Sequence, residues 1–362
     1  MTGRDRRIAL AGLLLCTALA RGAGGLLAGD NAAPTAQAPA RMDPDPAFLS
    51  PGESRTFTVT YRALVKEVPA GTKALRLWLP VPQDAPMQTI KGVDFQGPLA
   101  PRITTEKRFG NRLAYYEVAN PGATMHLAPD AKTFAWETSM SFTCTRKEQV
   151  TDLAKAAGDG TDAEPAPEAF RKDDRLTIVD DRIRKMAAEV AGGRKTTLEK
   201  ARAIYDFVAG KMTYDKSGTG WGRGDTNYAC DAGVGNCTDF HALFMSLCRA
   251  EGIAAGFEIG LYAPYKRNSE EKPGGYHCWA FFRVPGKTWV PVDISEADRN
   301  PDRMDYFFGA HTSNRVTMSV GRDLVLEPPQ AGEPLNFMIN PCAEADGKPL
   351  AAEKSWTMKD LE

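Results

Sequence analysis

The stretch GVGNCTDFHALF, residues 233–244, sets a cysteine between turn-forming residues and an apolar run. Asn236 and Asp239 have the spacing of a helix N-cap and its capping-box partner. The apolar residues that follow recur at the spacing of one buried helical face: Phe240, Leu243, Phe244 and Leu247. The stretch therefore predicts a core helix whose first residue is Cys237.

A cysteine at a helix N-terminus meets unpaired backbone N–H groups and the positive end of the helix dipole. Both favour the thiolate, which is the nucleophilic form of the side chain. A disulfide, a metal ligand and a buried core thiol are the alternatives for Cys237. Six cysteines follow residue 20: Cys144, Cys230, Cys237, Cys248, Cys278 and Cys342. None of them forms a CxxC pair, so we expect no structural metal site. Their disulfide pairing cannot be predicted from the sequence.

A nucleophilic cysteine needs a base, and the base needs a group that orients it. His277 and Asp293 flank a turn at residues 284–286 in a predicted hairpin. If the loop has three residues, His277 lies directly opposite Asp293, with Cβ atoms about 4.5–5.5 Å apart. Asp293 could then fix the imidazole tautomer and leave the other ring nitrogen for the thiol. The alternative for His277 is a half-buried histidine of a strand, and the alternative for Asp293 is a turn-forming residue at a strand end.

His241 is the rival base, because it lies one helical turn after Cys237 on the same side. No carboxylate is placed to orient it, so we expect it to position substrate or support the site from behind, and plain packing stays open. Asn236 and Trp279 are assigned the same supporting role. Cys278 should face away from His277 by strand alternation and act structurally.

The first twenty residues have the order of a secretory signal: basic residues, a short apolar segment, then Ala18-Leu19-Ala20. Arg6-Arg7 leaves a twin-arginine signal open, and Cys16 leaves a lipid anchor open, although the bulky Leu15 before it disfavours lipidation. Residues 21–50 read as an Ala/Pro-rich tether. We therefore expect an exported protein, periplasmic or secreted, with no membrane span in the mature chain.

The rest of the chain predicts an α+β protein. Alternating apolar runs separated by Pro and Gly over 51–148 predict a β-sandwich-like domain, and 149–194 reads as a connector and a helix. A helix over 196–212 opens at Thr197, whose third successor is Lys200, so no complete capping box is expected. Residues 195–300 hold the candidate site, and 301–362 form an extension expected to pack on it.

The charge balance excludes one broad class of partner. The 362 residues carry 45 Lys and Arg against 46 Asp and Glu, so no overall positive field favours nucleic acid. We expect a peptide or protein partner, no nucleic acid, no cofactor and no metal.

Three blocks of the sequence resemble the transglutaminase-like superfamily: GNCTDFHALFMSLCRAEGIAAGFEIG, then GYHCWAFF, then WVPVDISEA. The resemblance covers roughly residues 195–300. It implies a papain-like fold whose catalytic cysteine opens a helix, with the histidine and aspartate on following strands. Carried over to this sequence, it implies Cys237 as nucleophile, His277 as general base and acid, and Asp293 as the orienting group. The β-rich region before the core and the tail after it also resemble parts that accompany such exported bacterial domains.

The sequence also departs from that family. No acidic cluster suggests calcium activation, and GIAAGF at 252–257 lacks the arginine of the related pattern GIPAR. The Cys237 N–H supplies one oxyanion donor, while the second is open among Trp221, Tyr228 and a backbone group. The expected function is a cysteine-dependent acyl transferase or hydrolase acting on peptide or amide bonds through a thioester, with hydrolysis preferred. The alternative is a non-catalytic periplasmic binding or assembly module that keeps the fold.

Overall fold

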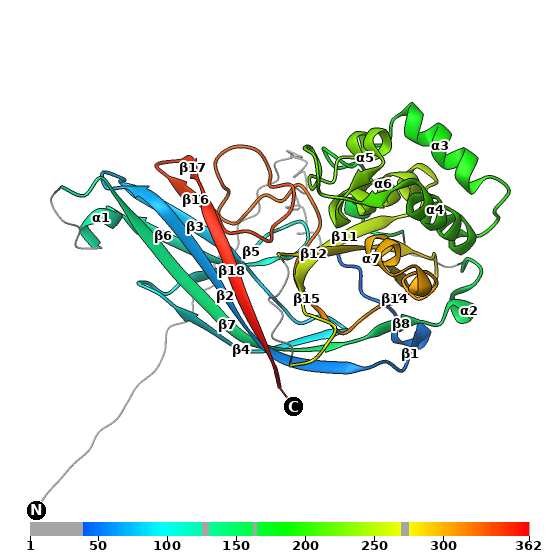
Figure 1. Cartoon of the computed structure of the whole chain (residues 1–362), viewed down its shortest axis with the longest axis horizontal. Helices are drawn as coiled ribbons and strands as arrows, with labels where there is room; N and C mark the ends of the chain where they lie inside the picture. Colours follow the sequence, from blue (N-terminus) through cyan, green and yellow to red (C-terminus); the bar gives the residue numbers. More distant parts are fainter. Residues whose placement is uncertain (1–38, 125–129, 162–164, 269–274, 362) are drawn as a thin grey trace, which may run out of the picture. The chain divides into compact units, whose positions relative to one another are not determined.

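A computed structural model describes residues 39–124, 130–161, 165–268 and 275–361. The predicted signal segment and residues 21–38 of the predicted tether lie outside this range. The described chain is a mixed α and β structure, as the sequence predicts, with antiparallel sheets and helices gathered beside one of them (Figure 1).

The sheet that carries the candidate site has four antiparallel strands in the order β13-β12-β11-β15. Their bounds are β11 (Ala255–Tyr262), β12 (His277–Arg283), β13 (Trp289–Val292) and β15 (Arg315–Val320). Helix α6 (Cys237–Ala250) packs against β12. The helices that surround α6 are α3 (Asp181–Ala191), α4 (Thr197–Lys211), α5 (Thr226–Ala232) and α7 (Ile294–Arg299).

The predicted helix start at Cys237 is confirmed. Asn236 is the N-cap of α6, and its side chain and that of Asp239 form a complete capping box. Every residue from Cys237 to Arg249 is buried, so the helix has no solvent face. A helix that is enclosed on all sides holds its first residue in a fixed place.

The expectation for α4 is wrong in one detail. The helix begins one residue earlier than a cap at Thr197 requires, so Thr196 is the N-cap and Glu199 stands at the third helical position. Thr196 and Glu199 form a complete capping box, which was not expected. Two successive threonines, Thr196 and Thr197, offer two registers for the cap, and only the folded chain shows which is used.

The N-terminal region forms two further antiparallel sheets with the strand orders β17-β16-β3-β6-β5 and β18-β2-β7-β4. Most of their buried apolar residues belong to a common core, and a hydrogen bond of 2.9 Å between the Tyr116 and Thr138 hydroxyl groups joins β6 to β7. The strands from this region are β2 (Ser54–Pro69), β3 (Ala74–Val81), β4 (Gln88–Gln96), β5 (Arg102–Thr105), β6 (Arg112–Ala119) and β7 (Thr133–Lys147), with the short helix α1 (Pro121–Thr124).

The residues after 300 divide between the two regions. Strand β15 extends the sheet of the candidate site, whereas the last three strands complete the N-terminal sheets: β16 (Cys342–Ala345), β17 (Lys348–Leu350) and β18 (Ala352–Leu361). Strand β18 lies beside β2 along most of its length (Figure 1). An alternating pattern predicts a strand but not its neighbour, so the sequence does not indicate this pairing.

Arg55 on β2 connects the C-terminal strand to the region of the candidate site. Its guanidinium donates to Asp360 at 2.7 Å, to Asn314 Oδ1 at 2.6 Å and to the Pro264 carbonyl at 2.7 Å. The side chain is 3% exposed. A buried guanidinium with three kinds of acceptor fixes these three segments to one another.

The predicted connector is structured at both ends. Strand β8 (Gln149–Thr151) lies between β1 (Leu49–Ser50) and β14 (Ala310–His311) in a small antiparallel sheet. The remaining short elements are α2 (Leu153–Ala156), the parallel pair β9 (Thr213–Tyr214) and β10 (Val234–Gly235), and the 3₁₀ turns η1 (Pro46–Phe48), η2 (Glu168–Phe170) and η3 (Pro301–Arg303).

Gly256 stands where the related pattern has an arginine, and its surroundings leave no room for a side chain. A Cβ placed there would lie 2.1 Å from Met42 Sδ and 2.7 Å from a Phe170 ring carbon. Residues from the tether and from the connector therefore fill the space beside β11. This packing leaves no room for the arginine of the related pattern.

Candidate active site

Cys237 opens α6 with its thiol buried. Its side chain is 1% exposed, and all six cysteines of the described chain are free thiols. Asn236 accepts a hydrogen bond from the Thr238 N–H at 2.9 Å, which satisfies one donor of the first turn. No residue in the described ranges accepts a hydrogen bond from the Cys237 N–H, so this donor is available to a ligand.

His277 and Asp293 are in contact, although not in the predicted register. Strand β12 pairs with β13 so that Ala280 lies opposite Val292, which places Asp293 two residues away from the position opposite His277. A shift of two residues preserves the face, and diagonal neighbours remain within reach of long side chains. His277 Nε2 accordingly donates to Asp293 Oδ2 at 2.7 Å.

Asp293 is fully buried and has more partners than the sequence suggested. Arg315 Nη1, from β15, donates to the same oxygen as His277 at 2.7 Å. The Ser295 hydroxyl and the Glu296 N–H both donate to the other oxygen at 3.1 Å. Burial by itself raises the pKa of Asp293, but the charges of His277 and Arg315 hold that pKa well below its usual range.

Cys237 and His277 shift each other's pKa in opposite directions. Burial raises the pKa of the Cys237 thiol, but hydrogen bonds from Cys278 and His277 and the imidazolium charge bring it down to about 6. Burial lowers the pKa of His277, but the Asp293 charge and hydrogen bond raise it to about 10. Between these two values the thiolate and the imidazolium coexist, which is the reactive state of a cysteine nucleophile.

His241 is not positioned as the base. Its Nε2 accepts from the Ile294 N–H at 3.2 Å, so its proton is on Nδ1, which lies 3.6 Å from Cys278 Sγ. Burial lowers the pKa of His241 to about 4, so the ring is neutral. A neutral histidine whose two nitrogens are both engaged supports the site from behind, which is one of the roles expected for it.

Cys278 does not behave as a remote structural thiol. Its side chain and its backbone N–H both form hydrogen bonds with the Cys237 thiol, and these bonds lower the pKa of Cys237. Cys278 Sγ also lies 3.6 Å from His241 Nδ1. That Cys278 faces away from His277 stays a prediction, and both residues pair in regular register with β11.

Asp239 anchors the loop that precedes α5. Besides the Asn236 N–H at 3.0 Å, its carboxylate accepts from Gly222 at 2.7 Å and Gly224 at 2.9 Å. A Cβ at Gly235 would lie 2.5 Å from Asp239 Oδ2, so a glycine is needed there. The capping residue thus also fixes the wall of the site beside Cys237.

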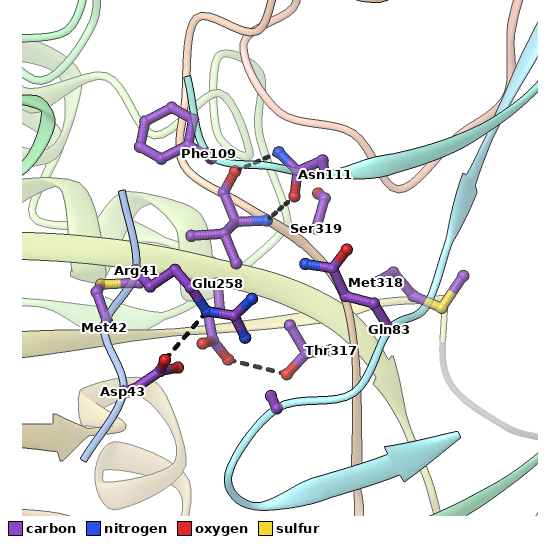
Figure 2. A pocket seen from close by; sticks show the side chains of 12 residues that line it. Arg41, Met42, Asp43, Gln83, Phe109, Asn111, Glu258, Thr317, Met318 and Ser319 are labelled. Carbon is purple, nitrogen blue, oxygen red and sulfur yellow. Dashed lines mark hydrogen bonds and ion pairs between the residues drawn. The ribbon is translucent and has the colours of Figure 1, made fainter. Parts of the chain in front are cut away.

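Trp279 lies behind the site. Its ring is fully buried, Arg315 lies 4.9 Å from its centroid, and its Nε1 donates to Glu258 Oε2 at 2.9 Å. Glu258 also accepts from the Thr317 hydroxyl at 2.9 Å, beside a cavity of about 30 Å³ (Figure 2). A space of that size holds about one water molecule and not a peptide. Trp279 therefore supports Arg315 and does not contact substrate in this conformation.

Neither aromatic candidate for the second oxyanion donor is directed at Cys237. Trp221 Nε1 donates to the Gly218 carbonyl at 3.1 Å, and the Tyr228 ring packs over Gly220. A different aromatic residue binds the neighbour of Cys237: the Tyr276 hydroxyl accepts from Asn236 Nδ2 at 2.9 Å.

A cleft of about 710 Å³ opens at His277. Its walls combine aromatic and charged residues: Tyr214, Lys216, Tyr262, Tyr265, Tyr276, Glu296 and Arg299. A cleft of this volume accommodates several residues of an extended peptide.

In the described ranges, no group of three or more His, Cys, Asp or Glu side chains could hold a metal ion. None of the described helices is long and apolar enough to span a membrane.

Sequence reasoning missed Arg315, Tyr276 and the role of Cys278. Arg315 stands in a strand of ordinary composition, and nothing in its neighbourhood signals that it is buried. Tyr276 is adjacent to His277 in the sequence, and an aromatic hydroxyl beside a candidate catalytic histidine was the one signal that could have found it.

Comparisons with known proteins bear on the fold of the region that holds the candidate site. The transglutaminase-like superfamily profile matches residues 184–294. An uncharacterized protein from Haemophilus influenzae is 27% identical over 328 residues, covering 81% of this chain and 86% of that protein. The crystal structure of a candidate cysteine protease from Cytophaga hutchinsonii aligns with a TM-score of 0.58 at 16% identity, covering 87% of this chain and 93% of the other. This last likeness shows a shared fold. Residues 184–294 thus form a transglutaminase-like domain, and the chain has the papain-like fold.

Proposed function

We propose that the protein is an exported, cysteine-dependent acyl transferase or hydrolase that acts on peptide or amide bonds. Cys237 is the nucleophile, His277 is the general base and acid, and Asp293 orients His277. The observation that carries the proposal is the buried thiol whose pKa of about 6 depends on an imidazole held at 2.7 Å from a buried carboxylate. A buried thiol with a pKa displaced so far is typical of a functional group.

The first half-reaction forms a thioester. The Cys237 sulfur bonds to the carbonyl carbon, and the carbonyl π pair moves to the oxygen. When that pair returns, the C–N bond breaks and the leaving nitrogen takes a proton from His277. In the second half-reaction, His277 removes a proton from water or from an amine, which attacks the thioester carbon and releases Cys237. The polar walls of the cleft admit water, so hydrolysis is the preferred outcome.

The proposal of export rests on the first twenty residues, which have the order of a secretory signal. Mass spectrometry of the exported protein should show a mature chain starting near Arg21. An intact Met1 would contradict export by cleavage, and a lipid adduct on Cys16 would make the protein membrane-anchored.

The function is tested by incubating the protein with peptide and amine libraries and following new products by mass spectrometry. The wild type should turn over a subset of substrates and carry an acyl adduct on Cys237, whereas Cys237→Ala should do neither. A Cys237→Ala variant with full turnover would refute the thioester mechanism. Substrate binding without turnover and without fast labelling of Cys237 would instead indicate the binding or assembly module.

A further inference from the structure

The Tyr276 hydroxyl lies at the N-terminus of α6, next to the first residue of the helix. Tyr276 immediately precedes His277 and lines the cleft. Its hydroxyl oxygen is 2.9 Å from Asn236 Nδ2, and Asn236 is the neighbour of Cys237. The phenol is therefore at the same end of the helix as the Cys237 N–H.

The orientation of Asn236 decides which way the Tyr276 proton points. Asn236 Oδ1 accepts two hydrogen bonds from Thr238, one from its N–H at 2.9 Å and one from its hydroxyl at 2.5 Å. These donors fix the amide, so Nδ2 must donate to Tyr276. The phenol oxygen is thus an acceptor toward Asn236, and its own proton is left for another acceptor.

We propose that Tyr276 is a catalytic residue that donates the second hydrogen bond to the substrate oxygen, together with the Cys237 N–H. This inference rests on the proposed function, because the oxygen becomes negative only when Cys237 adds to a carbonyl. The sulfur–carbon bond forms, the π pair moves to the oxygen, and the two donors stabilise that charge until the pair returns.

Two further observations support a phenol in this role. Burial and the nearby Cys237 charge raise the pKa of Tyr276, so it keeps its proton throughout the working pH range. The Thr238 hydroxyl lies beside the phenol, but a neutral hydroxyl is a weaker acceptor than an oxyanion. The Tyr276 hydroxyl therefore donates to the substrate oxygen, and no longer to the Thr238 hydroxyl, when negative charge develops on that oxygen.

The test uses two electrophiles that attack the same thiol. Iodoacetamide alkylates Cys237 without forming an oxyanion, whereas p-nitrophenyl acetate acylates it through one. Tyr276→Phe keeps the ring and removes the hydroxyl, so it should leave alkylation within about twofold of wild type and slow acylation about 10²–10³-fold. Tyr306→Phe is the matched control: Tyr306 donates to Glu148 outside the cleft, and both rates should be unchanged.

A second variant tests the orientation. Asn236→Asp keeps a good helix cap but replaces the Nδ2 donor with an acceptor that captures the Tyr276 proton. Acylation should fall relative to alkylation, with both rates measured above the thiol pKa of each variant so that the added charge does not confound them.

Each result has one meaning. If Tyr276→Phe slows both reactions equally, or neither, Tyr276 is not an oxyanion donor and the inference is wrong, while the proposed function stands. If the wild type shows neither fast alkylation nor acylation at Cys237, the proposed function fails and the inference fails with it.

Discussion

At the scale of single residues, the site consists of buried side chains that carry charges, although burial disfavours the charged forms. Cys237, His277, Asp293 and Arg315 are all almost fully buried. Their charges persist because each touches one of opposite sign, from the thiolate through the imidazolium and the carboxylate to the guanidinium. Removing a member leaves its neighbour with less compensation for a buried charge, which is far more costly than losing a surface ion pair.

Arg315→Met should therefore destabilise the protein strongly. It leaves the Asp293 carboxylate buried with His277 as its remaining charged partner, and the expected loss is about 3–5 kcal/mol of unfolding free energy. Arg62→Met is the control, because Arg62 pairs with Glu137 at 3.7 Å on an exposed surface, where the loss should stay below about 1 kcal/mol. Urea unfolding measures both. Equal losses in the two variants would show that Arg315 does not support Asp293.

At the scale of elements, the start of α6 was predictable because its signals are local. The cap, its partner three residues later and the apolar spacing all lie within twelve residues. The hairpin was predicted on the correct face but two residues out of register, because its pairing continues past Arg283 and the turn falls at residues 285–287. A register error of two residues keeps the two side chains on the same face of the sheet, but they are then diagonal neighbours and no longer directly opposite.

Asp239→Asn tests how α6 fixes the wall of the site. The amide keeps the shape but loses the charge and one acceptor for the three N–H groups that the carboxylate binds. Stability should fall by about 1–3 kcal/mol, and the Gly222 and Gly224 amides should exchange hydrogen faster.

Thr196→Ala provides the comparison on α4. It removes a cap and should cost about 1 kcal/mol without changing exchange at Gly222 or Gly224. Unchanged protection of those two amides in Asp239→Asn would show that the loop holds its position by other contacts.

At the scale of the whole molecule, the sequence predicted the two kinds of region but not how the chain divides between them. The triad residues proposed here lie within 195–300, yet Arg315 and β15 come from beyond it, and β16 to β18 return to the N-terminal sheets. Contacts between residues hundreds of positions apart, such as Arg55 with Asp360, leave no local pattern in a sequence.

A fragment of residues 195–300 should accordingly fail to fold alone. It leaves the edge of β11 unpaired and Asp293 without Arg315. Circular dichroism and thermal unfolding should show no cooperative transition, whereas residues 39–362 should unfold cooperatively. A fragment that unfolds cooperatively and still carries a reactive Cys237 would contradict the role assigned to β15.

The central claim is that His277, and not His241, holds Cys237 as a thiolate, and the pH dependence of Cys237 alkylation by iodoacetamide tests it most directly. In the wild type the rate should rise with a midpoint near pH 6, because the thiolate forms above that pKa while His277 stays protonated up to about 10. In His277→Ala the midpoint should move up toward pH 9, since the hydrogen bond and charge of His277 are lost and only the Cys278 hydrogen bonds still oppose burial, and the rate at pH 7 should fall by up to about 10²-fold. In His241→Ala the midpoint should stay within about one unit of the wild type, because that ring is already neutral. A midpoint that moves in His241→Ala and not in His277→Ala would contradict the account.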